Sequence, residues 1–250
     1  MSHTRRICMA VALSCSGIAG AAEPSLWLDW FASDDPSTPL SFDPADQGDV
    51  TSDQNGGMIY TGSLLNDSWQ LSWTTRIRNN SSNAYMDTAI SVINLSSETQ
   101  TFSLDTRMSL SDPLVNPETV DLAASLALTN TGFTGGAEVK DDMNESIIQA
   151  SLDGDVADVL FEGPYLLQAN GPFSSAVDSA ATSMMPTLEV LNQMSLLTTF
   201  QLSPGDLLNL TIVMDVSNIP APGVLSLIAV AGLIGTRSRR RTTSSGGSRP

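Results

Sequence analysis

One stretch near the middle of the chain alternates strictly between two kinds of side chain. Its first set is mostly apolar (Trp69, Leu71, Trp73, Thr75 and Ile77), and the residues between are polar (Gln70, Ser72, Thr74, Arg76 and Arg78). Side chains of a β-strand point alternately to opposite faces, so this pattern predicts a strand with one buried face. Such a strand needs paired neighbours and a second layer over its apolar side.

Further strand-like segments, separated by turn residues, follow one another from residue 23 to residue 217. We expect strands at Leu26–Phe31, Met58–Leu65, Val120–Thr129, Glu138–Lys140, Ser146–Leu152 and Val156–Phe161. Tyr85–Leu95 and Thr99–Leu110 are predicted to form a hairpin around Ser96-Ser97-Glu98. Residues 33–57 are interpreted as a long acidic loop, and Ser174–Met185 as a helix because its alanines fall near helical spacing.

The last two segments are marked by a clear turn. Leu196–Leu202 and Leu207–Val216 are predicted to be a strand pair joined by Ser203-Pro204-Gly205-Asp206. Proline in the second position and glycine in the third match a type II turn. Many short strands without a βαβ rhythm favour an all-β fold, an antiparallel β-sandwich that is Ig-like or jelly-roll-like.

The first 22 residues have the three regions of a secretory signal peptide. Arg5-Arg6 precede the apolar run Ile7–Leu13, and the small residues Ala19-Gly20-Ala21-Ala22 follow. We therefore expect export through the Sec translocon, with cleavage after Ala21 or Ala22. A twin-arginine signal at Arg5-Arg6 and a lipoprotein site at Cys15 are the two alternatives.

Removal of this segment restricts the chemistry of the exported part. Cys8, Cys15 and His3 all lie within it, so residues 23–217 contain neither cysteine nor histidine. This excludes disulfides, thiolate or imidazole metal sites, and Ser-His-Asp or Cys-His catalysis in the mature protein. One exported domain of this length can bury a core without disulfides.

The exported domain is strongly acidic. All 27 acidic residues lie there, against the four basic residues Arg76, Arg78, Arg107 and Lys140, which gives a net charge of −23. A surface of this charge repels phosphate backbones and anionic lipids, so we expect no nucleic-acid partner.

Residues 218–241 combine a proline motif, an apolar segment and a basic cluster. The apolar segment 224–235 would form a helix of about 18 Å, and extension back to Ile219 gives seventeen residues, the lower limit for spanning a bilayer. The basic cluster predicts that the C-terminal flank stays cytoplasmic. Two readings remain open: a sorting signal, or an ordinary membrane anchor that is never cut.

This order of parts resembles the PEP-CTERM sorting signal of exported bacterial proteins. The residues that carry the resemblance are Pro220, Ala221, Pro222, Gly223, Arg237, Arg239, Arg240 and Arg241. It implies an exosortase-type sorting enzyme as partner, a transient inner-membrane anchor, and delivery to the cell surface or matrix. Ala221 replaces the glutamate of the namesake motif, and a tail expected to be disordered, 242–250, follows the arginines.

The exported domain also looks like domains that accompany this signal. The similar stretches are Val92–Phe102 and Phe200–Asp206. This resemblance implies a β-rich exported domain and a surface location, and it implies no catalytic residue or cofactor.

Three groups of residues could carry chemistry in the domain. Calcium, which takes carboxylate and carbonyl oxygens, could be bound at Asp141–Glu145, at Asp153–Asp155 with Asp158, or at Asp53–Gly56. Trp27, Trp30, Trp69 and Trp73 could stack on sugars, although Trp69 and Trp73 are expected in the core. A hydrolase with a carboxylate pair stays open, because it needs only two acidic residues.

These observations give a main hypothesis and an alternative. The main hypothesis is a non-enzymatic surface or matrix protein associated with extracellular polysaccharide and sorted by its C-terminal signal, with no cofactor. The alternative is an extracellular module that binds carbohydrate or calcium.

Overall fold

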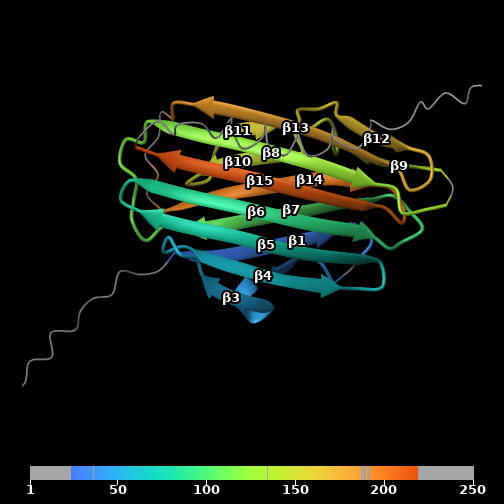
Figure 1. Cartoon of the computed structure of the whole chain (residues 1–250), viewed down its shortest axis with the longest axis horizontal. Helices are drawn as coiled ribbons and strands as arrows, with labels where there is room; N and C mark the ends of the chain where they lie inside the picture. The colour runs from blue at the N-terminus through green and yellow to red at the C-terminus, as the bar shows by residue number, and fades with distance from the viewer. Residues whose placement is uncertain (1–23, 36, 134, 187–189, 191, 219–250) are drawn as a thin grey trace, which may run out of the picture.

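The computed structural model describes residues 24–35, 37–133, 135–186, 190 and 192–218. They form two antiparallel β-sheets packed face to face, which confirms the predicted sandwich (Figure 1). The predicted signal peptide, the C-terminal helix with its motif and basic cluster, and the tail lie outside these residues. Among the residues described, no helix has the length and apolar composition to cross a membrane.

Sheet A has the strand order β11-β10-β14-β7-β1-β2, and β9 pairs with both β14 and β12. Its strands are β1 (Ser25–Ala32), β2 (Leu40–Phe42), β7 (Gln100–Ser109), β9 (Gly136–Lys140), β10 (Ile148–Leu152), β11 (Asp155–Leu160), β12 (Leu166–Asn170) and β14 (Gln193–Leu202).

Sheet B has the order β13-β8-β15-β6-β5-β4-β3 and lies in front in Figure 1. Its strands are β3 (Gly48–Ser52), β4 (Met58–Leu65), β5 (Trp69–Asn80), β6 (Asn83–Asn94), β8 (Thr119–Thr129), β13 (Ser175–Met184) and β15 (Leu207–Ser217). A short 3₁₀ helix, η1 (Pro44–Asp46), precedes β3.

The strand pairs from β6 onward are nested. β6 pairs with β15, β7 with β14, β8 with β13, and β9 with β12. Between β6 and β9, and again between β12 and β15, successive strands alternate between the two sheets. This part of the chain is therefore one long antiparallel hairpin wound across both layers.

Two predicted hairpins are wrong in their partners. The strands expected at Tyr85–Leu95 and Thr99–Leu110 exist as β6 and β7, but they lie in opposite sheets. The same holds for β14 and β15. Turn residues mark a chain reversal without choosing a partner, and a link of four or five residues can cross the roughly 10 Å between stacked sheets.

Asn94 connects the two links that pass from one sheet to the other, between β6 and β7 and between β14 and β15. Its backbone N–H donates to the carbonyl of Asp206, and its own carbonyl accepts from Gly205 N–H. The side-chain Nδ2 donates to the carbonyls of Glu98 (2.8 Å) and Leu202 (2.9 Å). Gly205 has φ +72°, as expected for glycine in the predicted turn. The two stretches that carried the domain resemblance thus meet at one end of the sandwich.

The helix predicted at Ser174–Met185 is wrong. The segment is β13, which pairs with β8 along ten residues, from Ser175↔Thr129 to Met184↔Val120. Alanine favours a helix locally, whereas Val177, Thr182 and the four serines of the segment do not, so hydrogen bonding to the edge of β8 decides the conformation. The acidic loop predicted at 33–57 is also too long, because it contains β2, η1 and β3.

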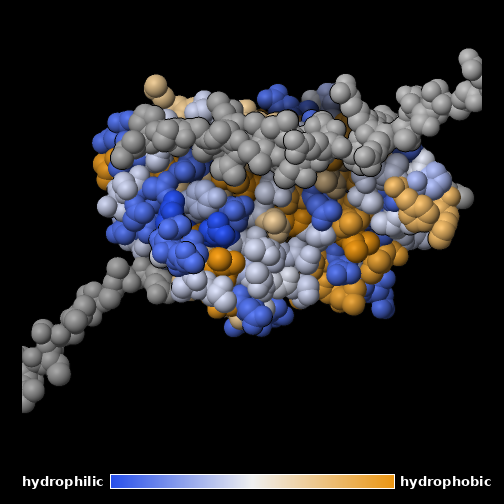
Figure 2. All heavy atoms as spheres, viewed as in Figure 1, coloured by the Kyte–Doolittle hydropathy of each residue, from blue (hydrophilic) through white to orange (hydrophobic). Residues whose placement is uncertain are grey.

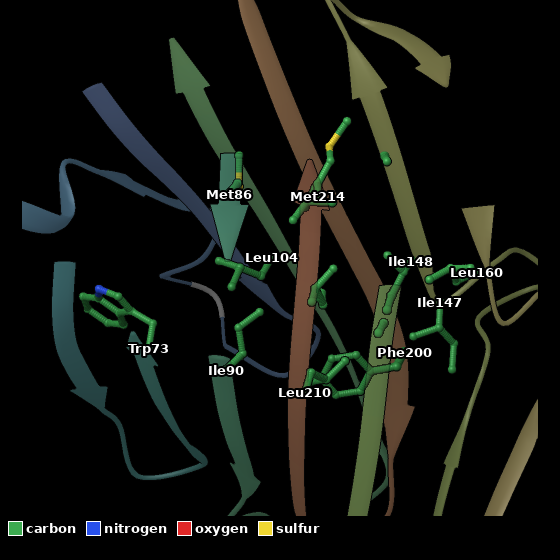
Figure 3. Packing of buried hydrophobic residues seen from close by; sticks show 14 of the residues in the cluster. Trp73, Met86, Ile90, Leu104, Ile147, Ile148, Leu160, Phe200, Leu210 and Met214 are labelled. Carbon is green, nitrogen blue, oxygen red and sulfur yellow. The ribbon is translucent and has the colours of Figure 1, made fainter. Parts of the chain in front are cut away.

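The core between the sheets is apolar and aromatic. Trp30 stacks on Phe102, with ring centroids 5.4 Å apart, and lies 5.3 Å from Trp69. Figure 3 shows side chains from both sheets meeting in this layer, among them Trp73, Leu104 and Phe200. The apolar face predicted for β5 is confirmed, since all five of its alternating residues are buried.

Candidate functional site

The four tryptophans separate into three core residues and one surface residue. Trp30, Trp69 and Trp73 are buried at 0, 2 and 3 % exposure. Trp27 is 42 % exposed on the outer face of sheet A, and Phe31, two residues further along β1, is 38 % exposed. The core placement of Trp69 and Trp73 was expected. For the two that the sequence left undecided, the structure places Trp27 outside and Trp30 inside.

Strand register gathers other residues around these two rings. Trp27 lies opposite Arg107, Asp29 opposite Asp105, and Phe31 opposite Ser103 on β7. β7 in turn places Leu197 of β14 beside Asp105, and Thr199 beside Ser103. We define the aromatic–acidic face as this part of sheet A, made of Trp27, Asp29, Phe31, Ser103, Asp105, Arg107, Leu197 and Thr199.

A continuous polar network crosses the aromatic–acidic face. Trp27 Nε1 donates to Ser41 Oγ (2.8 Å), and the Ser41 hydroxyl donates to Asp29 Oδ1. Arg107 forms ion pairs with Asp29 through one terminal nitrogen and with Asp105 through Nε, the latter at 3.4 Å. These contacts fix the orientation of the Trp27 ring and of both carboxylates before any ligand arrives.

Asp105 lies at the centre of this face and is incompletely paired. Burial raises its pKa from 3.8 to about 6. Its Oδ1 is buried and has no hydrogen-bond partner within the described part of the chain. Buried polar atoms without partners cost free energy.

A cavity of about 300 Å³ adjoins the face. It is lined by Glu145, Ser146, Gln149, Leu197 and Thr199. Gln149 of β10 lies opposite Leu197, which itself lies opposite Asp105. The outer face of sheet A therefore carries three features in order. The exposed rings lie on β1, the ion pairs join β1 to β7, and the polar cavity lies at β14 and β10.

The predicted calcium-binding segments use their carboxylates within the fold. Asp53 Oδ1 accepts from the backbone N–H groups of Asn55 and Gly57, each at 2.7 Å. Asp141 Oδ1 accepts from Tyr165 N–H at 2.6 Å, and Asp142 Oδ1 from Gln201 Nε2 at 2.7 Å.

The third calcium candidate also forms a turn. Asp153 Oδ1 accepts from the N–H groups of Asn192 and Gln193, both at 2.8 Å, and Gly154 follows with φ +92°. Among the residues that the structure describes, no three acidic, histidine or cysteine side chains gather as metal ligands. Asp53, Asp141, Asp142 and Asp153 thus act as acceptors in turns and loops, and Asp158 of β11 accepts from the Thr182 hydroxyl.

A second charged cluster lies on the outer face of sheet B. Asp215 faces Asp121 on one side and Tyr85 on the other, and burial raises the pKa of Asp215. Asn83 Nδ2 donates to Asp215, and Arg78 lies 5.4 Å from the centre of the Tyr85 ring. Figure 2 shows polar and apolar residues intermixed on this side. These groups serve as partners for one another, and we assign them no ligand.

The sorting residues Pro220, Ala221, Pro222, Gly223, Arg237, Arg239, Arg240 and Arg241 all lie outside the described residues. Sequence reasoning missed Asp29, Asp105 and Arg107. One signal was available in Leu26–Phe31, where side chains alternate between two faces. One face is wholly apolar, whereas the face of Trp27 and Phe31 also carries Asp29. This aspartate marks the second face as the solvent side.

Comparison with known proteins gave little beyond these observations. No protein-family model matches the chain, and no curated protein sequence matches it. Among solved structures, it is similar to TmCBM61, a carbohydrate-binding module in complex with β-1,4-galactotriose. The identity is 10 %, the TM-score 0.29, and the match covers 62 % of this chain and 97 % of the other. A likeness at this level bears on neither the site nor its ligand.

Proposed function

We propose that this chain is an exported, non-enzymatic protein of the cell surface or extracellular matrix that binds polysaccharide through the aromatic–acidic face. The observation that carries the binding proposal is the exposed pair Trp27 and Phe31 beside the Asp29–Arg107–Asp105 network. Aromatic faces give sugars a large rigid contact area, and fixed polar groups next to them orient the hydroxyls. We infer also that the nested strand pairs make the domain a jelly-roll variant.

The export route completes the proposal. The N-terminal segment would direct the chain through the Sec translocon, and the C-terminal segment would hold it in the inner membrane until an exosortase-type enzyme acts. The domain would then reach the matrix, which contains the polysaccharide that it is proposed to bind. This part rests on the sequence resemblance of residues 218–241.

The binding proposal is tested with one exchange on the face and one elsewhere. Affinity electrophoresis of the full chain through gels containing galactan, β-glucan or xylan measures retardation. We expect Trp27→Ala to weaken binding by about tenfold, or about 1.4 kcal/mol. Phe133→Ala is the matched control, since Phe133 is an exposed aromatic (82 %) after β8. Equal retardation of both variants would place the site elsewhere, and a wild-type chain that no polysaccharide retards would reject the binding function.

A carboxylate-pair hydrolase is the second candidate. Asp29 and Asp105 lie directly opposite each other, and the raised pKa of Asp105 suits a general acid. Hydrolysis would further need the two carboxyl groups to flank a bound glycosidic bond, which binding alone does not require, so we place this candidate second. Release of reducing ends from galactan or xylan, abolished by Asp105→Asn, would favour it over a binding role.

A further inference from the structure

The charges around the aromatic–acidic face determine which polysaccharides can approach it. Asp29 and Asp105 flank a single cation, Arg107, so the three together carry a net charge of −1. Glu145, in the adjoining cavity, adds a further negative charge. The other cation of sheet A, Lys140 of β9, lies 3.9 Å from Glu138.

The remaining cations of the described chain lie in sheet B, on β5. Arg76 pairs with Asp53 at 3.6 Å, and Arg78 donates to Asn83 Oδ1 at 3.0 Å. A sugar carboxylate brought to the face would therefore meet two carboxylates beside a single cation that already pairs with both. Like charges placed together across an interface disfavour binding.

We propose that the aromatic–acidic face selects uncharged hexose or pentose polymers and rejects polymers of uronic acids. A neutral chain donates its hydroxyls to the acceptor oxygens of Asp29 and Asp105 without electrostatic cost. About a third of each of the side chains of Asp29, Asp105 and Arg107 is exposed (31, 31 and 36 %), so the carboxylates can accept from, and the guanidinium can donate to, adjacent sugar hydroxyls. This inference rests on the proposed polysaccharide binding and adds the chemical class of the ligand.

Selectivity is tested by comparing galactan with polygalacturonate as gel-embedded ligands for the full chain at low salt. The wild-type chain should bind galactan at least about tenfold more tightly than polygalacturonate. The double variant Asp29→Asn with Asp105→Asn changes the local charge from −1 to +1, and we expect it to gain about tenfold in affinity for polygalacturonate. The control, Asp49→Asn with Asp67→Asn, makes the same change in net charge at exposed positions on β3 and after β4.

The outcomes separate the two proposals. The face does not select by charge if the wild-type chain binds both polymers equally, or if both double variants gain equal affinity for polygalacturonate. In either case, weaker binding of Trp27→Ala would still establish the face as the binding site. If no polymer is retarded by the wild-type chain, the binding function and this inference both fail. Discrimination that the face variant alone removes supports the inference.

Discussion

Asn94 shows how one buried side chain can hold two chain crossings. It is fully buried, and its amide serves the links that follow both β6 and β14. Its Oδ1 also accepts from Ser96 N–H at 3.0 Å. The side-chain amide of Asn94 thus bonds to three residues, and a shorter side chain would remove its donor from the buried carbonyl of Leu202.

We therefore expect Asn94→Ala to lower the free energy of unfolding by about 2–3 kcal/mol. Urea unfolding followed by tryptophan fluorescence measures this change. Asn209→Ala is the control, because Asn209 is exposed near the start of β15. Equal stability of the two variants would mean that the crossings are held by their backbone hydrogen bonds alone.

Asp105 makes stability depend on pH in a defined direction. Burial raises its pKa from 3.8 to about 6 in the folded state. Between these values the folded protein binds more protons than the unfolded chain, so this carboxyl makes stability fall as pH rises. Asp105→Asn should remove that contribution.

The measurement is urea unfolding of wild type and Asp105→Asn at pH 4, 5, 6 and 7. The variant should gain stability relative to wild type as pH rises from 4 to 6, and the difference should level off above that. A constant difference across the range would mean that Asp105 titrates alike in the folded and unfolded chains.

At the scale of elements, the sequence pattern predicted the positions of strands more accurately than it predicted which strands pair. Met58–Leu65 was predicted with the bounds of β4, and the buried face of β5 was correct in all five positions. Alternation of apolar and polar residues along a strand indicates which of its faces is buried, because successive side chains point to opposite faces. Partner choice depends on contacts with residues far along the chain, so the hairpins at β6–β7 and β14–β15 were misassigned.

β13 offers a test of strand against helix. Ala181 is exposed and faces Ala123 across the pairing with β8. In a strand, Ala181→Val should raise the free energy of unfolding by a few tenths of a kcal/mol, up to about 0.5, because β-branched residues favour extended backbone. In a helix the same exchange would be destabilising. Chemical denaturation distinguishes the signs, and Ala181→Gly should destabilise in either case.

For the whole molecule, we propose that residues 23–217 bind the ligand while the N-terminal segment and residues 218–241 direct sorting. The charge of −23 on residues 23–217 repels anionic surfaces. The proposed preference of the aromatic–acidic face for uncharged polymers is consistent with this charge. Under this proposal, sorting and binding are separate properties, carried by different parts of the chain.

Sorting is tested by cell fractionation of the full-length chain and of a chain that ends before Ile219, with mass spectrometry of the mature C-terminus. We expect the full-length chain to lose Arg239, Arg240 and Arg241 and to reach the surface, and the truncated chain to be mislocalised. Mature surface protein that keeps the arginines would favour the uncut anchor, and unchanged location after truncation would contradict the sorting role.

The sequence by itself determined the all-β class, the inward face of β5, the positive φ at Gly205 and the absence of cysteine and histidine from residues 23–217. These properties depend on each residue and its near neighbours. Only the tertiary structure decided that Asp29 and Asp105, 76 positions apart in the sequence, face each other beside Trp27. Their meeting follows from the register of β1 on β7, which the packing of the whole core fixes and no local pattern encodes.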